Sequence, residues 1–306
     1  MLMKPNYVRI YGHRGARGDY PENTIEGFEY LFSTGVKAFE FDVLIAKDSI
    51  PVLVHDFRLN ISNTRDAQGQ WLLNRDQKVN QMTSQELQQY DVGSINPSSS
   101  YGRRFKDQKQ LDNIRIPTLA KLFELLNQNA NKDVFLNLEI KSTPVEEGLT
   151  PKPNEMVQII LNEIKKSSLE DRTLISSFDW RIIKEFKKQA PNILRGHLSL
   201  QQDLGSFKKN ISANSPWVDE NITEIELFEL PKVIKKLAGH AWCPFYRDVT
   251  KQNVELAHNL GLAVNTWTVN SESDFQRMIE YGVDGIITDY PKKLQDFCKS
   301  KNIAWF

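Results

Sequence analysis

The chain has 306 residues, of which 40% are hydrophobic and 25% are charged, a balance that excludes an intrinsically disordered protein. Its 39 Lys and Arg residues match its 39 Asp and Glu residues, so the net charge gives no reason to expect nucleic acid or an anionic membrane surface as a partner. The length exceeds the ~100–200 residues of a usual single domain, yet an α/β barrel of ~250 residues folds as one domain. One domain and two domains therefore both stay possible.

The N-terminal residues and the cysteines limit the location and the metal chemistry. The start of the chain, MLMKPNYVRIYGHRG, lacks the apolar run of ~7–15 residues that a signal peptide needs, and no stretch reaches ~18 consecutive apolar residues. We therefore expect a cytoplasmic protein with no integral membrane segment. Cys243 and Cys298 are too few for a disulfide framework, and neither lies in a pattern that binds zinc.

Short runs rich in β-branched and aromatic residues alternate along the chain with segments of helical period. This pattern is typical of βα units around a parallel sheet. The predicted strands are residues 8–13, 38–43, 134–140, 173–178, 193–198, 241–245, 263–269 and 284–289. The predicted helices between them are NTIEGFEYLF, PTLAKLFELLNQN, NEMVQIILNEIKK, RIIKEFKKQ, VTKQNVELAHNL and ESDFQRMIEYG. Eight such units predict a TIM (β/α)8 barrel of the α/β class.

A ninth strand-like run, IPVLVHD at 50–56, follows the second strand after only a short polar turn. So short a link permits a hairpin and excludes a parallel crossover, so the run is predicted as an antiparallel return. The next residues, 57–117, are rich in Asn, Gln, Ser and Arg, and we interpret them as a cap inserted over one barrel face. Segment 201–240 is also irregular, although LFELPKVIKKLA within it has helical period. With this insertion, 1–306 is predicted to form a single domain.

Acidic residues share one face of two predicted strands. Glu40 and Asp42 point the same way because strand side chains alternate, and Glu139 occupies the equivalent place near the end of the third strand. In a TIM barrel the active site gathers at the C-terminal ends of the strands. The alternative, surface charges in ion pairs, is disfavoured because buried carboxylates cost several kcal/mol unless they are paired or bound to metal. Three carboxylates without a nearby Cys favour one hard divalent cation, either Mg²⁺ or Ca²⁺.

Two of the five histidines lie beside these carboxylates. His13 ends the first strand and His55 ends the return strand, and two imidazoles beside an anion could act as general base and general acid near neutral pH. A lone histidine is more often a core or surface residue. We assign that role to His197, His240 and His258.

Positive charges and a helix start complete the candidate site. Arg14 and Lys141 would supply the positive charge that an anionic phosphate needs, with a structural ion pair as the alternative for each. Asn23 followed by Glu26 resembles an N-cap box. Glu22, just before it, could hold His13, the metal or a hydroxyl.

Together these motifs resemble the glycerophosphodiester phosphodiesterase family. The words that carry the resemblance are HRGARGDYPENTIEGF, FEFDVLIAKDSIPVLVHD, IPTLAKLFELL, NLEIK, ISSF, WTVN and GVDGIITDYP. They occur in the family's order over nearly the whole chain, and their joint order is specific where single words are not. The resemblance implies a TIM barrel with a small insertion after the second strand, and the hydrolysis of a small-molecule glycerophosphodiester to sn-glycerol 3-phosphate and an alcohol.

The resemblance also implies a role for each site residue. His13 and His55 would be the acid/base pair, and Arg14 and Lys141 would contact the phosphate. The ligands of one divalent cation would be Glu40, Asp42 and Glu139, and the residues lining the substrate would be Glu22, Phe178 and Trp267.

Two other functions stay open. A lysophospholipase D or sphingomyelinase-D-like enzyme would use the same residues but would need an apolar entrance. The polar insertion argues against such an entrance, apart from a small patch at Trp71, Leu72 and Leu73. A noncatalytic glycerophosphate-binding barrel would lack a catalytic His or a metal carboxylate, and none is missing. The sequence does not indicate the alcohol, the nucleophile (water or the glycerol 2-hydroxyl) or the oligomeric state.

Overall fold

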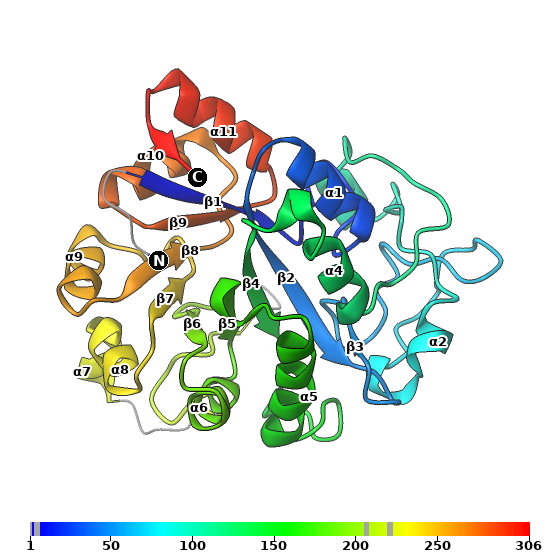
Figure 1. Cartoon of the computed structure of the whole chain (residues 1–306), viewed down its shortest axis with the longest axis horizontal. Helices are drawn as coiled ribbons and strands as arrows, with labels where there is room; N and C mark the ends of the chain where they lie inside the picture. Colours follow the sequence, from blue (N-terminus) through cyan, green and yellow to red (C-terminus); the bar gives the residue numbers. More distant parts are fainter. Residues whose placement is uncertain (1, 3–6, 205–207, 219–222) are drawn as a thin grey trace.

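Eight parallel strands close into a barrel, as predicted (Figure 1). The computed structural model describes residues 2, 7–204, 208–218 and 223–306. The barrel strands are β1 (Tyr7–His13), β2 (Ala38–Ile45), β4 (Phe135–Ile140), β5 (Thr173–Ser177), β6 (Leu194–Ser199), β7 (Ala241–Pro244), β8 (Ala263–Thr266) and β9 (Gly285–Thr288). The barrel closes because β1 pairs with β2 on one side and with β9 on the other. Each predicted strand overlaps one of these eight.

Helices cover the outside of the barrel (Figure 1). The predicted helices correspond to α1 (Ile25–Ser33), α4 (Leu119–Leu126), α5 (Pro153–Lys166), α6 (Trp180–Gln189), α9 (Lys251–Asn259) and α10 (Glu272–Tyr281). Segment 201–240 contains α7 (Glu224–Phe228) and α8 (Leu230–Lys236), while its residues 205–207 and 219–222 lie outside the described residues. The C-terminal elements α11 (Pro291–Ser300) and β10 (Ala304–Trp305), which pairs parallel with β1, were not predicted. Short stretches η2 (Asn129–Asn131) and η3 (Glu170–Arg172) precede β4 and β5.

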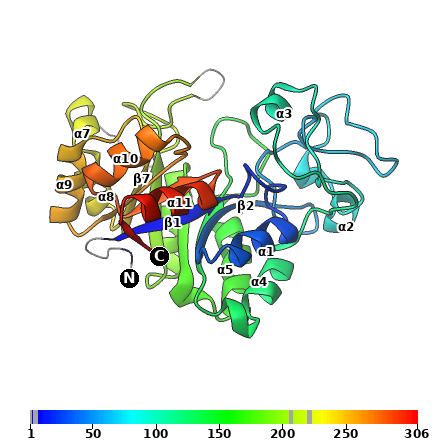
Figure 2. The same cartoon turned by 90° about the horizontal axis from the view of Figure 1, so that it is seen from above.

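The return strand and the insertion follow β2. β3 (Pro51–Val52) pairs antiparallel with the end of β2, which confirms the predicted hairpin. The insertion contains η1 (Val79–Gln81), α2 (Ser84–Leu87) and α3 (Ser100–Arg104), and it lies to one side of the barrel (Figure 2). Its small apolar cluster includes Leu44 of β2, so it is attached to the barrel. That 1–306 is one domain with a cap stays a prediction.

The two faces of β2 have opposite chemistry, as its alternation predicts. Phe39 and Phe41 point outward into the main core, where the Phe28 ring of α1 lies 4.8 Å from the Phe39 ring, centroid to centroid. Glu40 and Asp42 point the other way and are also buried. The barrel therefore presents carboxylates to its own interior, where their charge must be balanced.

Within the described part of the chain, no helix combines the length and the apolar character that a membrane span requires. The cytoplasmic location stays a prediction.

A buried histidine on β6 makes stability depend on pH. The His197 ring packs edge-on against Trp180 with centroids 4.8 Å apart, and its Nδ1 has no hydrogen-bond partner among the described residues. Burial, with Arg195 nearby, lowers the pKa of His197 to about 3. Below about pH 6.5, His197 therefore binds a proton in the unfolded chain but not in the folded chain. The folded state becomes less stable relative to the unfolded state as the pH falls.

The free energy of unfolding should decrease from pH 7 to pH 5, and we expect this decrease to be about 2 kcal/mol smaller in His197→Gln than in the parent chain. Urea denaturation at each pH measures this. His258→Gln is the matched control with the opposite sign, because the Asp284 carboxylate raises the pKa of His258 and so adds stability at low pH. Equal pH slopes for the parent and His197→Gln would contradict the prediction.

Candidate active site

The structure brings the predicted site residues together in one place. A cavity of 1220 Å³ opens where the barrel strands end. Most of the predicted residues line it, namely His13, Arg14, Glu40, His55, Glu139, Lys141, Phe178 and Trp267. Asp42 and Glu22 lie behind this lining and contact it through Arg14.

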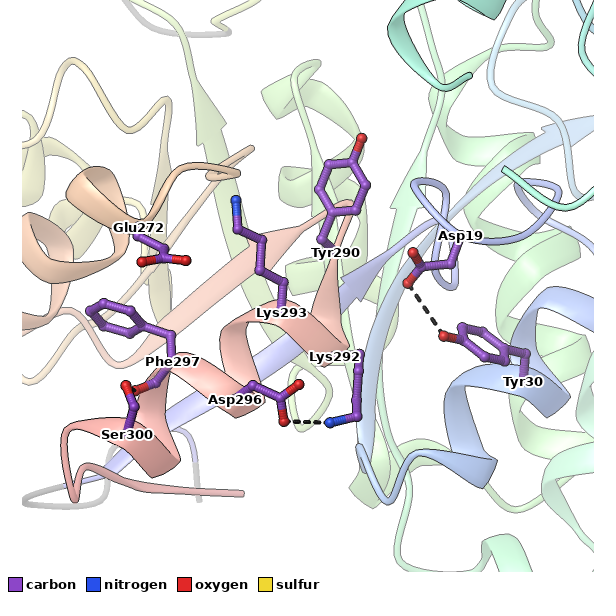
Figure 3. Close-up of a pocket in the computed structure, with 9 residues that line it drawn as sticks. All are labelled: Asp19, Tyr30, Glu272, Tyr290, Lys292, Lys293, Asp296, Phe297 and Ser300. Carbon is purple, nitrogen blue, oxygen red and sulfur yellow. Dashed lines mark hydrogen bonds and ion pairs between the residues drawn. The ribbon is translucent and has the colours of Figure 1, made fainter. Parts of the chain in front are cut away.

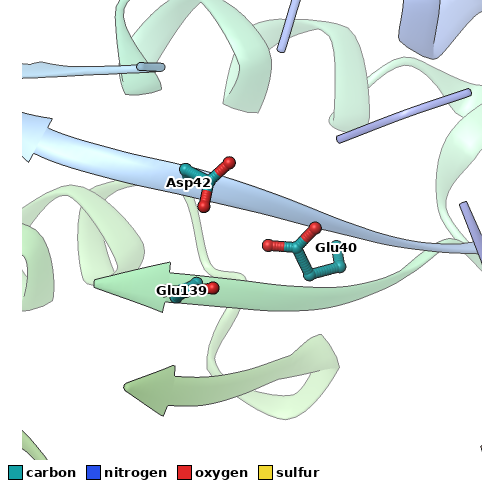
Figure 4. A group of neighbouring side chains, drawn as sticks. All are labelled: Glu40, Asp42 and Glu139. Carbon is teal, nitrogen blue, oxygen red and sulfur yellow. The ribbon is translucent and has the colours of Figure 1, made fainter. Parts of the chain in front are cut away.

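Three buried carboxylates lie on the neighbouring strands β2 and β4 (Figure 4). One oxygen each of Glu40, Asp42 and Glu139 lies within 4.8 Å of the other two. Burial, with repulsion from Asp42 and Glu139, raises the pKa of Glu40 well above its usual range. Glu40 Oε1 and Asp42 Oδ1 have no hydrogen-bond partner among the described residues. This donor set, all oxygen with two atoms that accept no hydrogen bond from the described residues, fits a hard divalent cation.

The two predicted phosphate contacts are also ion-pair partners of these carboxylates. Arg14 Nε lies 3.2 Å from Asp42 Oδ2, and Lys141 Nζ lies 2.5 Å from Glu139 Oε1 and 3.6 Å from Asp42 Oδ1. Burial opposes the charged form of Asp42, but the charges of Arg14, His55 and Lys141, together with the hydrogen bond from Asn23, outweigh it and lower the pKa of Asp42. Both expected roles of Arg14 and Lys141 are therefore compatible, because each pairs with a carboxylate and still lines the cavity.

The N-cap assigned to Asn23 is wrong. Thr24 caps α1, its Oγ1 accepting a hydrogen bond from the Gly27 backbone N–H, while Asn23 adopts a left-handed φ of 54°. Asn tolerates this conformation. The turn directs the Asn23 side chain at β2, where Nδ2 donates to Asp42 Oδ2 at 2.9 Å and Oδ1 accepts from the Asp42 backbone N–H. Asn23 therefore orients a carboxylate of the site, a role that the sequence analysis missed.

Glu22 does not reach His13. It accepts a hydrogen bond from Arg14 Nη1 at 2.8 Å and another from the Tyr101 hydroxyl. The contact with Tyr101 was not predicted, because Tyr101 belongs to α3 of the insertion. The insertion thus contacts the barrel through a partly buried residue next to the site.

Each candidate catalytic histidine is held by an aspartate. His13 Nδ1 lies 2.6 Å from Asp289 Oδ1, and its Nε2 lies 3.7 Å from Glu40 Oε2. Burial, with the Arg17 charge nearby, lowers the pKa of His13 to about 3. His55 Nδ1 lies 2.5 Å from Asp56 Oδ1. Because Nδ1 is engaged in both rings, Nε2 is the nitrogen left for chemistry.

One part of the cavity wall is apolar. Phe178 and Trp267 meet edge to face with centroids 5.3 Å apart, and Trp267 Nε1 donates to the Cys243 carbonyl. The apolar surface continues along the segments at the ends of β4 to β7, with Ile140, Val145, Leu149, Leu198, Leu200, Leu204, Trp217 and Phe245. The insertion itself contributes charged side chains to the lining, namely Arg58, Arg75 and Arg104. The insertion is polar, but other loops supply an apolar wall, and Trp71, Leu72 and Leu73 are not part of it.

A second cavity, of 520 Å³, lies outside the barrel between the loop before α1, α1 itself, the start of α10 and the length of α11 (Figure 3). Four of its five charged side chains, all but Glu272, have partners among the described residues. Lys292 pairs with Asp296, Lys293 donates to the Asn270 carbonyl, and the Tyr30 hydroxyl donates to Asp19. With most of its charges paired in this way, the cavity offers little to a ligand.

Comparisons with known proteins agree with this geometry. A glycerophosphodiester phosphodiesterase of Caldanaerobacter subterraneus subsp. tengcongensis is 30% identical over 93% of this chain and 95% of its own. A lysophospholipase D of Homo sapiens is 26% identical over 93% of this chain and 84% of its own.

Two solved structures resemble the whole chain. A candidate glycerophosphoryl diester phosphodiesterase of Silicibacter pomeroyi superposes with a TM-score of 0.88 at 39% identity, covering 100% of this chain and 98% of that one. An Oleispira antarctica phosphodiesterase, solved with the product sn-glycerol-3-phosphate, has a TM-score of 0.68 at 25% identity, covering 96% and 97%. The family model described as "Glycerophosphoryl diester phosphodiesterase family" matches residues 13–293. The chain therefore belongs to the glycerophosphoryl diester phosphodiesterase family and is a phosphodiesterase.

Proposed function

We propose that this chain hydrolyses glycerophosphodiesters to sn-glycerol 3-phosphate and an alcohol, with His13 and His55 as general acid and base. The observation that carries the proposal is that two histidines, each held by an aspartate, line one cavity together with two members of a cluster of three buried carboxylates. The Oleispira antarctica phosphodiesterase, which was solved with sn-glycerol-3-phosphate, supports this product.

Glu40, Asp42 and Glu139 would hold one divalent cation, Mg²⁺ or Ca²⁺. When bound, the cation offsets the negative charge of the three carboxylates and of the phosphodiester. Arg14 and Lys141, which lie beside these carboxylates and face the cavity, would bind the phosphate oxygens with their remaining N–H donors.

The two histidines then move the protons. One Nε2 accepts the proton of the attacking hydroxyl, and the other donates a proton to the leaving alcohol oxygen. Water and the glycerol 2-hydroxyl both suit this arrangement as the attacking group. Phe178 and Trp267 would form a wall beside the alcohol or the glycerol, and Glu22 would keep Arg14 in place. The insertion, 57–117, would act as the cap of the site.

The test is the identity of the products. Incubated with glycerophosphocholine, the protein should release glycerol 3-phosphate and choline in equal amounts. Release of phosphocholine and glycerol would mean that the other ester bond is cleaved. Binding of glycerophosphocholine without hydrolysis would favour the noncatalytic glycerophosphate-binding barrel.

The apolar wall favours a second candidate function, lysophospholipase D activity. The cavity of 1220 Å³ exceeds what glycerophosphocholine fills, and its apolar lining extends to Val145, which is 64% exposed at the mouth. An acyl chain would be stabilised by this surface. The human and mouse relatives named lysophospholipase D are similar over most of the chain.

If this second activity is present, we expect Val145→Asp to lower kcat/KM for lysophosphatidylcholine about 10-fold, because a charge would replace an apolar contact with the acyl chain. Hydrolysis of glycerophosphocholine should change by less than about threefold. Leu73→Asp is the matched control, since Leu73 is 95% exposed and outside the cavity. Equal rates on lysophosphatidylcholine for both variants would exclude the acyl chain from this wall.

A further inference from the structure

A buried row of contacts connects the insertion to the catalytic histidine His13. Asp289, which directly follows β9, is fully buried at 0% exposure and accepts hydrogen bonds from three side chains. Its Oδ1 lies 2.6 Å from His13 Nδ1 and 2.8 Å from Arg17 Nε, and its Oδ2 lies 3.1 Å from Arg17 Nη2 and 2.7 Å from Asn270 Nδ2. Both carboxylate oxygens are therefore occupied by donors.

This arrangement determines which nitrogen of His13 carries the proton. A carboxylate held by a guanidinium and an amide N–H is ionised and can only accept, so His13 Nδ1 must donate. Nε2 is then left with its lone pair, on the cavity side of the ring, 3.7 Å from Glu40 Oε2. The aspartate thus fixes both the tautomer and the orientation of the ring.

Arg17 is in turn held by the insertion. Its guanidinium lies over the Phe105 ring at 4.9 Å from the centroid, and over the Tyr101 ring at 5.9 Å. Gln108 Nε2 donates to the Arg17 carbonyl at 2.7 Å. Phe105 and Gln108 are 2% and 4% exposed, so these contacts are shielded from water. The insertion therefore supports the group that clamps Asp289.

We propose that Asp289 is the positioning residue for His13, and that the insertion takes part through Phe105 and Arg17. The inference rests on the proposed function in one respect, the catalytic role of His13. A purely structural ion pair between Arg17 and Asp289 is the competing explanation, since it would also join the end of β1 to the end of β9. The two explanations differ in what removal of the Asp289 charge does to the tautomer of His13 and to kcat.

The first test uses Asp289→Asn, which keeps the size of the side chain. We expect kcat for glycerophosphocholine to fall at least about 10²-fold while KM stays within about threefold of the parent value. The reason is that the variant loses the Nδ1–H tautomer of His13 but keeps the contacts with the substrate. ¹⁵N shifts of the imidazole, assigned with His13→Gln, should report the Nδ1–H tautomer in the parent and a mixture in Asp289→Asn. Asp284→Asn is the matched control, because Asp284 binds a different histidine, His258, at the other end of β9, and its kcat should stay near that of the parent.

The second test addresses the insertion. Phe105→Ala should lower kcat about fivefold, and Arg17→Lys should lower it further, because Lys cannot clamp both carboxylate oxygens. Thermal unfolding identifies loss of fold, and Phe105→Leu, which keeps an apolar side chain, should retain the parent Tm and lose less activity.

Either an unchanged tautomer or a kcat within about threefold of the parent in Asp289→Asn would overturn the positioning role. A parent kcat in Phe105→Ala would overturn the part given to the insertion. If the parent protein releases no glycerol 3-phosphate, the proposed function fails, but the ¹⁵N tautomer measurement still tests the His13–Asp289 contact on its own.

Discussion

Turnover of glycerophosphocholine should fall at least about 10²-fold in His13→Ala and in His55→Ala, while both variants still bind the divalent cation. Each variant removes a proton donor or acceptor at Nε2 and leaves the three carboxylates in place. Release of glycerol 3-phosphate measures turnover, and calorimetric titration with Mg²⁺ or Ca²⁺ measures cation binding.

The control for this pair is His240→Ala. His240 is half-buried, bonds to the Arg195 backbone N–H and lies outside the cavity, so its removal should leave turnover near that of the parent. Near-normal turnover in His13→Ala or His55→Ala would remove that residue from the proposed chemistry. Loss of cation binding in either variant would instead indicate that the histidine supports the carboxylates.

The parts of the site that follow from local pattern could be predicted from the sequence. Alternation along a strand places Glu40 and Asp42 on one face whatever the rest of the chain does. The short turn before β3 forces an antiparallel hairpin, and this brings His55 back toward the same strand end. Eight βα units then leave a closed barrel as the simplest arrangement.

The parts that depend on distant contacts could not be predicted. His13 and Asp289 are separated by 276 positions and meet only because β1 and β9 are neighbours in the closed barrel. Tyr101 and Phe105 lie in an insertion with little periodic signal, so the sequence does not show where α3 docks. The apolar wall of the cavity could not be predicted for the same reason, because its residues come singly from several loops and form no continuous apolar stretch in the sequence.

Asn23 shows how a local signal can mislead. Asn23 and Thr24 are both good N-cap residues, and Glu26 three positions after Asn23 suggested a capping box. The structure uses Thr24 for the cap and turns Asn23 toward Asp42. The hydrogen bond from the Asn23 amide to the buried Asp42 carboxylate outweighs the local preference of Asn23 for the N-cap. The spacing of residues in the sequence does not indicate this contact.

Removal of the divalent cation with EDTA should abolish the release of glycerol 3-phosphate, and added Mg²⁺ or Ca²⁺ should restore it. Glu40→Gln should lower activity at least about 10²-fold and weaken cation binding at least about 10-fold, because one of the three oxygen ligands loses its charge. Calorimetric titration and the product assay measure the two effects.

Without metal, Glu40→Gln and Asp42→Asn should also differ from each other in thermal stability. Burial and repulsion from Asp42 and Glu139 make the charge of Glu40 unfavourable, as its raised pKa indicates, so metal-free Glu40→Gln should have a Tm equal to or above that of the metal-free parent. Asp42 is held by Arg14, Lys141 and Asn23, so Asp42→Asn should leave the two cations short of a partner and lower the Tm. Because both variants remove one carboxylate charge, a general loss of packing would lower both values. A lower Tm in metal-free Glu40→Gln would therefore mean that the carboxylates are balanced without a cation, and would contradict the metal site.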